Sequence, residues 1–118
     1  ALSLHAPSNP ETRHIINAAA IAAMQTTAVI VNTARGDLID TKALAAALTE
    51  GRLGGAALDV FEPEPLPDND PLRAAPNLIL TPHSAWYSQG AIARLQTLAA
   101  DEIARALSGR PPRRAVPT

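Results

Sequence analysis

The stretch Val29-Ile30-Val31-Asn32-Thr33-Ala34-Arg35-Gly36-Asp37-Leu38-Ile39-Asp40 decides the fold of this 118-residue chain. It opens with an apolar run rich in β-branched residues, which predicts a strand over 28–32 that is buried on both faces of a sheet. Arg35 follows at the end of that strand, where a charged side chain needs a partner. Because the planar guanidinium suits a carboxylate, Arg35 predicts a site for a small organic acid.

Strands and helices are predicted to alternate along the rest of the chain. Apolar runs predict further strands, and capped periodic stretches predict helices. The further strands are predicted over 2–5, 55–60 and 77–81. One helix is predicted over 18–24 with Asn17 as its cap, and a second over 41–50 with Asp40 as its cap and Gly51 at its end. A third helix is predicted from the Ser88 cap to about Leu107. No hairpin signal separates the strands, so the pattern indicates right-handed βαβ crossovers. We expect an α/β fold, half of a doubly wound parallel sheet of about four strands with flanking helices.

The length suits one domain rather than two. We predict one folded unit over 1–109 and a flexible, proline-rich tail over 110–118. The chain opens inside a predicted strand, so we expect it to be a fragment of a longer protein.

Composition and charge exclude several classes of function. The formal net charge of −1 gives no strong field for nucleic acid or an anionic membrane. The sequence holds no cysteine, which excludes disulfides and thiolate metal sites and fits a reducing cytoplasm. No apolar run approaches the roughly 18 residues of a membrane span. We therefore expect a cytoplasmic protein without a nucleic-acid or membrane partner.

Polar residues follow three successive predicted strands. Arg35 ends one of them, Asp59 ends the next with Glu62 and Glu64 close behind, and His83 ends the last. Because the carboxyl ends of parallel strands meet at one edge of a sheet, we expect these side chains to lie near each other.

Other interpretations of these residues stay open at this point. Arg35 could form a structural salt bridge with Glu64, Asp59 could cap a turn, and His83 could be an ordinary loop residue. A metal site built from Asp59, Glu64 and His83 matches no common ligand spacing, and Arg35 would repel the ion. The sequence contains neither a Gly-x-Ser-x-Gly elbow nor a Gly-x-Gly-x-x-Gly phosphate loop.

Four ordered blocks resemble the D-isomer-specific 2-hydroxyacid dehydrogenases, at matching intervals and over nearly the whole chain. The blocks are residues 31–36, 57–61, 64–65 and 81–83. The stretch 82–88 is most similar to the C-terminal-binding-protein-like branch of that family. The resemblance implies the C-terminal half of a Rossmann-like NAD-binding domain plus a returning C-terminal helix. It places the glycine-rich loop and the substrate domain outside this sequence.

The resemblance also implies a role for individual residues. Arg35 would hold the substrate carboxylate and polarise its carbonyl, while His83 would exchange the proton. Glu64 would orient the imidazole and favour its protonated form, which completes the catalytic set. Trp86 would line the substrate pocket beside Arg35 and His83. The residues implied to face the cofactor are His5, Ala6, Pro7, Thr33, Ala34, Arg35, Asp59 and His83.

The function implied is hydride transfer between NAD(H), with NADP(H) as the other option, and a small 2-oxo or 2-hydroxy acid. The full-length protein is expected to be a homodimer. The alternatives are an NAD(H)-responsive, corepressor-like binding protein and an inactive remnant without the phosphate-binding loop. For these residues alone we expect negligible turnover and weak NAD binding.

Overall fold

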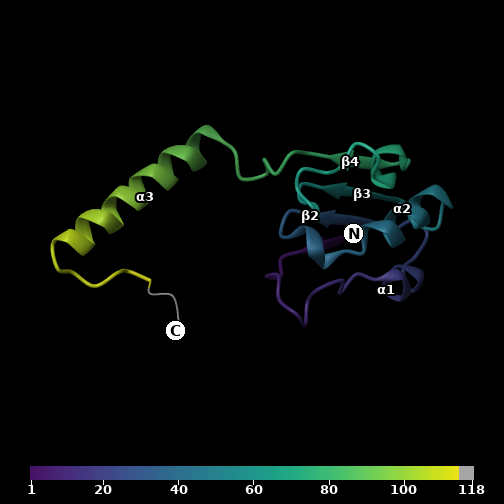
Figure 1. Ribbon diagram of the computed structural model, residues 1–118, viewed down its shortest axis with the longest axis horizontal. Helices are drawn as coiled ribbons and strands as arrows, with labels where there is room; N and C mark the ends of the chain where they lie inside the picture. The colour runs from purple at the N-terminus through teal and green to yellow at the C-terminus, as the bar shows by residue number, and fades with distance from the viewer. Residues whose placement is uncertain (115–118) are drawn as a thin grey trace. The chain divides into compact units, whose positions relative to one another are not determined.

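The computed structural model describes residues 1–114, and the chain divides into two compact units, Ala1–Ala85 and Trp86–Thr118. The first unit holds the strands β1 to β4 and the helices α1 and α2, and the second holds the helix α3 (Figure 1). The last four residues of the predicted tail, 115–118, lie outside the described residues.

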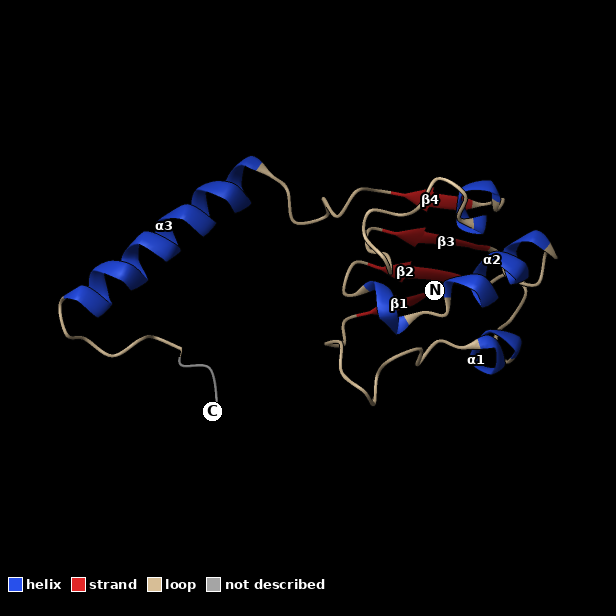
Figure 2. Cartoon of the chain, viewed as in Figure 1, coloured by secondary structure: helices blue, strands red, loops and turns tan. Residues whose placement is uncertain are grey.

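The four strands form one parallel sheet in the order β1-β2-β3-β4 (Figure 2). Their bounds are Leu2–Leu4 for β1, Val29–Asn32 for β2, Gly55–Leu58 for β3 and Leu78–Leu80 for β4. The α/β prediction and the parallel arrangement are therefore confirmed. Since all four strands run the same way, their carboxyl ends share one edge of the sheet.

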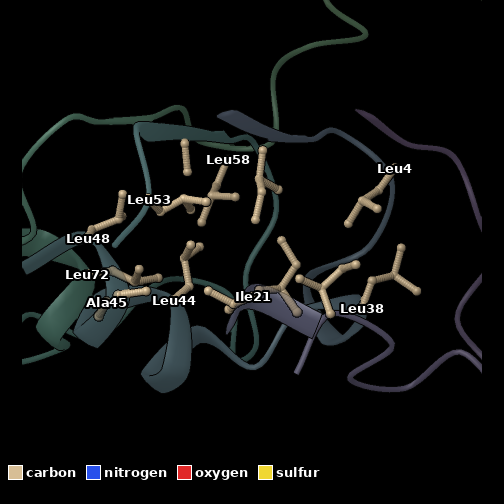
Figure 3. Packing of buried hydrophobic residues seen from close by; sticks show 14 of the residues in the cluster. Leu4, Ile21, Leu38, Leu44, Ala45, Leu48, Leu53, Leu58 and Leu72 are labelled. Carbon is tan, nitrogen blue, oxygen red and sulfur yellow. The ribbon is translucent and has the colours of Figure 1, made fainter. Parts of the chain in front are cut away.

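One face of the sheet carries the hydrophobic core. In the strand register, Ile30 pairs with Ala56 and Asn32 pairs with Leu58, and all four are buried on that face. The helices α1 (Ala18–Ala22) and α2 (Thr41–Thr49) supply the opposing side chains, and Figure 3 shows the core between them and the sheet. The largest fully buried side chains of these helices are Ile21, Leu44 and Leu48.

The opposite face of the sheet is more open. Its central row runs in register through Ser3, Val31, Ala57 and Ile79, and the Ile79 residue is 66% exposed. Val29 on the same face is 37% exposed. The prediction that this strand is buried on both faces is thus wrong, because α1 and α2 both pack on the core face.

Local sequence signals fix where the helices begin. Asn17, Asp40 and Ser88 each accept a backbone N–H from the first turn of α1, α2 and α3 (Gln89–Leu107), as predicted. Two short 3-10 helices, η1 (Gly36–Leu38) and η2 (Pro71–Ala74), occupy segments for which the sequence predicted no helix or strand. Each is a single turn, which is too short to leave a periodic pattern in the sequence.

The second unit is built around α3, which has no buried residue. Its large exposed apolar side chains are Leu95, Leu98, Ile103 and Leu107. After α3 the chain turns back, and Arg113 lies 3.4 Å from Asp101 and 3.5 Å from Glu102. No helix among residues 1–114 is long and apolar enough to cross a membrane.

Candidate active site

The carboxyl edge of the sheet gathers the predicted site residues of the first unit. The chain leaves β1 at His5, β2 at Thr33 and β3 at Asp59, while β4 leads through Thr81 to His83. The parallel register of the strands therefore places these residues along one edge (Figure 2).

Glu64 and His83 form a hydrogen-bonded pair at this edge. The Nδ1 atom of His83 lies 2.8 Å from Oε2 of Glu64, and the other carboxylate oxygen accepts the Phe61 N–H at 2.9 Å. The hydrogen bond with His83, followed by that from Phe61, holds the pKa of Glu64 below its ordinary value. With Nδ1 held by the carboxylate, the ring presents Nε2 as its proton-exchanging atom.

The turn that presents His83 is built around Asp59. His83 has φ of 53°, in the left-handed region, and its N–H donates to the Thr81 carbonyl at 3.0 Å. Asp59 is only 3% exposed and accepts the Ser84 and Ala85 N–H groups at 2.8 Å each and the Thr81 hydroxyl at 2.5 Å. Asp59 thus holds the Thr81 side chain before His83 and the backbone of Ser84 and Ala85 after it, in a turn where His83 keeps its positive φ.

The charge of Asp59 is stabilised by these contacts. Burial on its own would raise the pKa of this carboxyl group. The hydrogen bonds from Thr81, Ala85 and Ser84 outweigh burial, so the pKa of Asp59 lies below its ordinary value. A carboxyl whose folded-state pKa is depressed contributes stability above its unfolded pKa, and that stability is lost as the pH falls.

Replacing Asp59 with Ala is expected to lower the free energy of unfolding at neutral pH by about 2–5 kcal/mol, because three donors lose a buried charged acceptor. For the unchanged chain, the free energy of unfolding should fall as the pH drops below about 4. Urea titrations monitored by circular dichroism at a series of pH values test both statements. Asp101→Ala is the matched control, since Asp101 is an exposed helix residue. Equal stability of Asp59→Ala and the unchanged chain would contradict this assignment.

Asn32 sets the turn that carries Arg35. Its side chain is buried, with Oδ1 accepting the Ala34 N–H at 3.0 Å and Nδ2 donating to the Arg35 carbonyl at 2.8 Å. The exposed guanidinium of Arg35 donates to the Ala34 carbonyl at 2.6 Å. Within residues 1–114 no carboxylate lies in ion-pair range of Arg35, so the alternative of a structural salt bridge with Glu64 is not supported.

The turns that carry Arg35 and Glu64 are joined through backbone contact. A Cβ atom on Gly36 would lie 2.1 Å from the carbonyl carbon and oxygen of Phe61. Phe61 is the residue whose N–H holds Glu64. Only glycine permits this approach, so Gly36 sets the spacing between the two turns.

Replacing Gly36 with Ala should therefore destabilise the fold, by about 1–3 kcal/mol or more, since the methyl group would meet backbone rather than a mobile side chain. Denaturant titration measures the change. Gly90→Ala is the control, because a Cβ there meets nothing within 4 Å and helical Ala is favoured over Gly. Wild-type stability of Gly36→Ala would contradict the contact.

A cavity of about 490 Å³ lies beside the Glu64–His83 pair. Its walls are largely apolar and include Phe61, Leu66 and Leu80, while its polar lining residues are Glu64, His83, Thr81 and Arg73. A mostly apolar hollow with a few polar groups is the usual form of a small-molecule site. No group of three or more His, Cys, Asp or Glu residues among residues 1–114 could hold a metal ion.

The other predicted site residues have contacts of their own. His5 is exposed, and its Nε2 lies 2.8 Å from the Ser3 hydroxyl. The Pro7 carbonyl accepts the Thr12 hydroxyl at 2.7 Å. Trp86 belongs to the second unit and makes an edge-on contact with Tyr87, at 5.4 Å between ring centroids. Its predicted place at the substrate stays a prediction.

Sequence reasoning missed three residues that shape the site: Asn32, Gly36 and Thr81. A signal existed for Asn32, because an amide at the end of an otherwise apolar strand has to find hydrogen-bond partners. For Gly36 and Thr81 the partners are 25 and 22 residues away, at Phe61 and Asp59, and no local pattern indicates them.

Comparison with known proteins identifies the family. The family model described as "D-isomer specific 2-hydroxyacid dehydrogenase, NAD binding domain" matches residues 1–85. The chain belongs to this family. The matching segment is its NAD-binding domain, which confirms the family resemblance and the Rossmann-like fragment expected from the sequence.

Curated relatives include a glyoxylate reductase of Thermofilum pendens, 47% identical over 111 residues, or 94% of this chain and 33% of the relative. A D-3-phosphoglycerate dehydrogenase of Methanocaldococcus jannaschii is 49% identical over 108 residues, or 92% of this chain and 20% of the relative. The chain thus spans a third or less of the length of these relatives.

Solved structures agree with the fold. A Thermus thermophilus protein superposes with a TM-score of 0.91 at 43% identity, covering 98% of this chain and 37% of that one. A D-isomer specific 2-hydroxyacid dehydrogenase of Lactobacillus delbrueckii in its NAD complex has a TM-score of 0.85 at 32% identity, covering 98% and 39%. One of Xanthobacter autotrophicus in complex with NADPH has a TM-score of 0.80 at 37% identity, covering 98% and 47%.

Proposed function

We propose that this chain forms the nicotinamide side of an NAD(H)- or NADP(H)-dependent reductase of small 2-oxo acids. The observation that carries the proposal is the Glu64–His83 pair, 2.8 Å apart, at the sheet edge to which β2 also brings Arg35. An acid held by a carboxylate and a nearby guanidinium are the two groups that carbonyl reduction beside a carboxylate requires.

The chain's own residues would act on the oxygen atoms of the substrate. Arg35 would bind the substrate carboxylate and stabilise the negative charge that develops on the carbonyl oxygen. His83 would give the proton on Nε2 to that oxygen and recover one from solvent. Glu64 would hold the ring through Nδ1 and stabilise its cationic form. The bound nicotinamide would supply the hydride to the carbonyl carbon.

Two acceptors at this edge fit the carboxamide of a nicotinamide. The Asp59 carboxylate accepts three hydrogen bonds, and one of its four lone pairs remains for another donor. The Ala34 carbonyl accepts one hydrogen bond from Arg35 and retains a second lone pair. We assign the carboxamide to Asp59 and Ala34. The turn at His5, Ala6 and Pro7, together with Thr33, would line the ribose.

The named relatives are reductases and dehydrogenases, which favours this function over the corepressor-like alternative. A homodimeric, cytoplasmic full-length enzyme is part of the proposal. The cysteine-free sequence supports the compartment. Sedimentation of the full-length protein would test the dimer.

The activity is best tested by grafting the chain in place of the matching third of the Thermofilum pendens glyoxylate reductase, to which it is 47% identical. Oxidation of NADH and NADPH is followed at 340 nm with glyoxylate, hydroxypyruvate and pyruvate. The graft is expected to turn over at least one of the three acids, and the isolated chain none. A folded graft that reduces none would refute the proposed function.

A further inference from the structure

Arg13 joins two segments that flank the candidate active site. Its guanidinium lies 2.7 Å from Oε1 of Glu62 and 3.9 Å from Oδ2 of Asp37. Asp37 belongs to η1, directly after the Arg35–Gly36 turn, while Glu62 directly follows Phe61. The Glu62 hydrogen bond raises the pKa of Arg13 above its ordinary value. Arg13 therefore bridges the turn that carries Arg35 and the turn that carries Glu64.

The backbone around Arg13 is itself fixed to η1. The His14 N–H donates to the Asp37 carbonyl at 2.7 Å, and Ile16 forms a parallel bridge with Ile39. The Ser8 hydroxyl also donates to the Asp37 carboxylate. The backbone that carries Arg13 is thus held against η1, so the ion pair with Arg13 ties Glu62 to that segment.

We propose that Arg13 is a positioning residue, which holds Glu62 and thereby keeps the following residue pair Pro63–Glu64 in place for contact with His83. An effect of Arg13 on catalysis depends on the proposed function above. Two contacts define the start of this turn, the backbone of Phe61 on Gly36 and the side chain of Glu62 on Arg13. Glu64 then reaches back to the Phe61 N–H and across to His83.

The Phe61 amide reports on this arrangement without any ligand. Its proton is bonded to Glu64, so its exchange rate follows the geometry of the turn and its chemical shift follows the ionisation of Glu64. Charged or titratable groups that face the turn are Arg13, His14, Asp37, Asp59 and His83, and Arg73 lines the same cavity as Glu64.

The test is an NMR comparison of the isotope-labelled full chain with four variants. In Arg13→Met we expect the Phe61 amide to exchange about 2- to 5-fold faster. We also expect the pH midpoint of its chemical shift to rise, because a displaced Glu64 loses the hydrogen bond from His83. Arg13→Lys should restore most of both values. The swap of Arg13→Glu with Glu62→Arg should restore them in part, because the carboxylate then at position 13 would lie beside Asp37, and partial recovery separates pairing from the mere loss of a charge. Glu62→Gln should also speed the exchange of the Phe61 amide and raise its pH midpoint, but by less than Arg13→Met.

Arg52→Met is the matched control. Arg52 is also about half exposed and paired with a glutamate, Glu50 at 2.6 Å, outside the candidate site. Arg52→Met should leave the exchange rate and the pH midpoint of the Phe61 amide unchanged. Wild-type exchange and midpoint in both Arg13→Met and Glu62→Gln would overturn the proposal. An inactive graft would refute the proposed function and leave these ligand-free measurements unaffected.

Discussion

Replacing His83 with Gln in the active graft is expected to lower kcat for 2-oxo acid reduction by about 10²- to 10⁴-fold. Glutamine keeps a polar side chain of similar reach but cannot deliver a proton to the forming alkoxide. Because Asp59 fixes the backbone of Ser84 and Ala85 directly after residue 83, the variant should fold normally. Stopped-flow and steady-state NADH oxidation measure the loss.

Two comparisons make this result specific. Glu64→Gln retains a hydrogen-bond acceptor for Nδ1 without the negative charge, so its loss should be smaller than that of His83→Gln. Glu50→Gln, at the exposed end of α2, should have no effect. Retention of kcat within about threefold in His83→Gln would remove His83 from the role of general acid.

Replacing Arg35 with Met is the second large change. We expect kcat/KM for the oxo acid to fall by about 10²- to 10³-fold, since both the carboxylate contact and the stabilised carbonyl oxygen are lost. Arg35→Lys should lose less but remain impaired, because an ammonium group is a point charge that cannot bind a carboxylate with two parallel bonds.

The exposure of Arg35 makes the result interpretable. Its guanidinium contacts only its own turn among the described residues, through the Ala34 carbonyl, so removal leaves no buried carboxylate unpaired. The unfolding transition should therefore stay unchanged. Arg52→Met controls for loss of a surface charge. Equal kcat/KM for Arg35→Met, Arg35→Lys and the unchanged graft would show that Arg35 takes no part.

Much of the fold was predictable because its signals are local. The caps Asn17, Asp40 and Ser88 all lie where the sequence places them, and the four strands appear in parallel order. The edge that gathers the polar residues follows from that order alone. The Glu64–His83 pair was implied by family resemblance, and its contact required the structure.

The remainder depends on contacts between distant segments. Arg13 meets Glu62 across 49 residues, and Gly36 meets the backbone of Phe61. Neither contact has a periodic or spaced pattern in the sequence. The burial of strand 28–32 was overestimated because an apolar run shows that a strand is suited to burial, and not which of its faces a helix covers.

We propose that this edge of the sheet directs hydride to the carbonyl carbon of a 2-oxo acid. The most direct measurement uses NADH carrying deuterium at C4 of the nicotinamide with the active graft, followed by mass spectrometry of the product. We predict a D-2-hydroxy acid with deuterium at C2 from one face of the cofactor, and loss of that product in His83→Gln. Oxidation of NADH without deuterium at C2 would contradict the account.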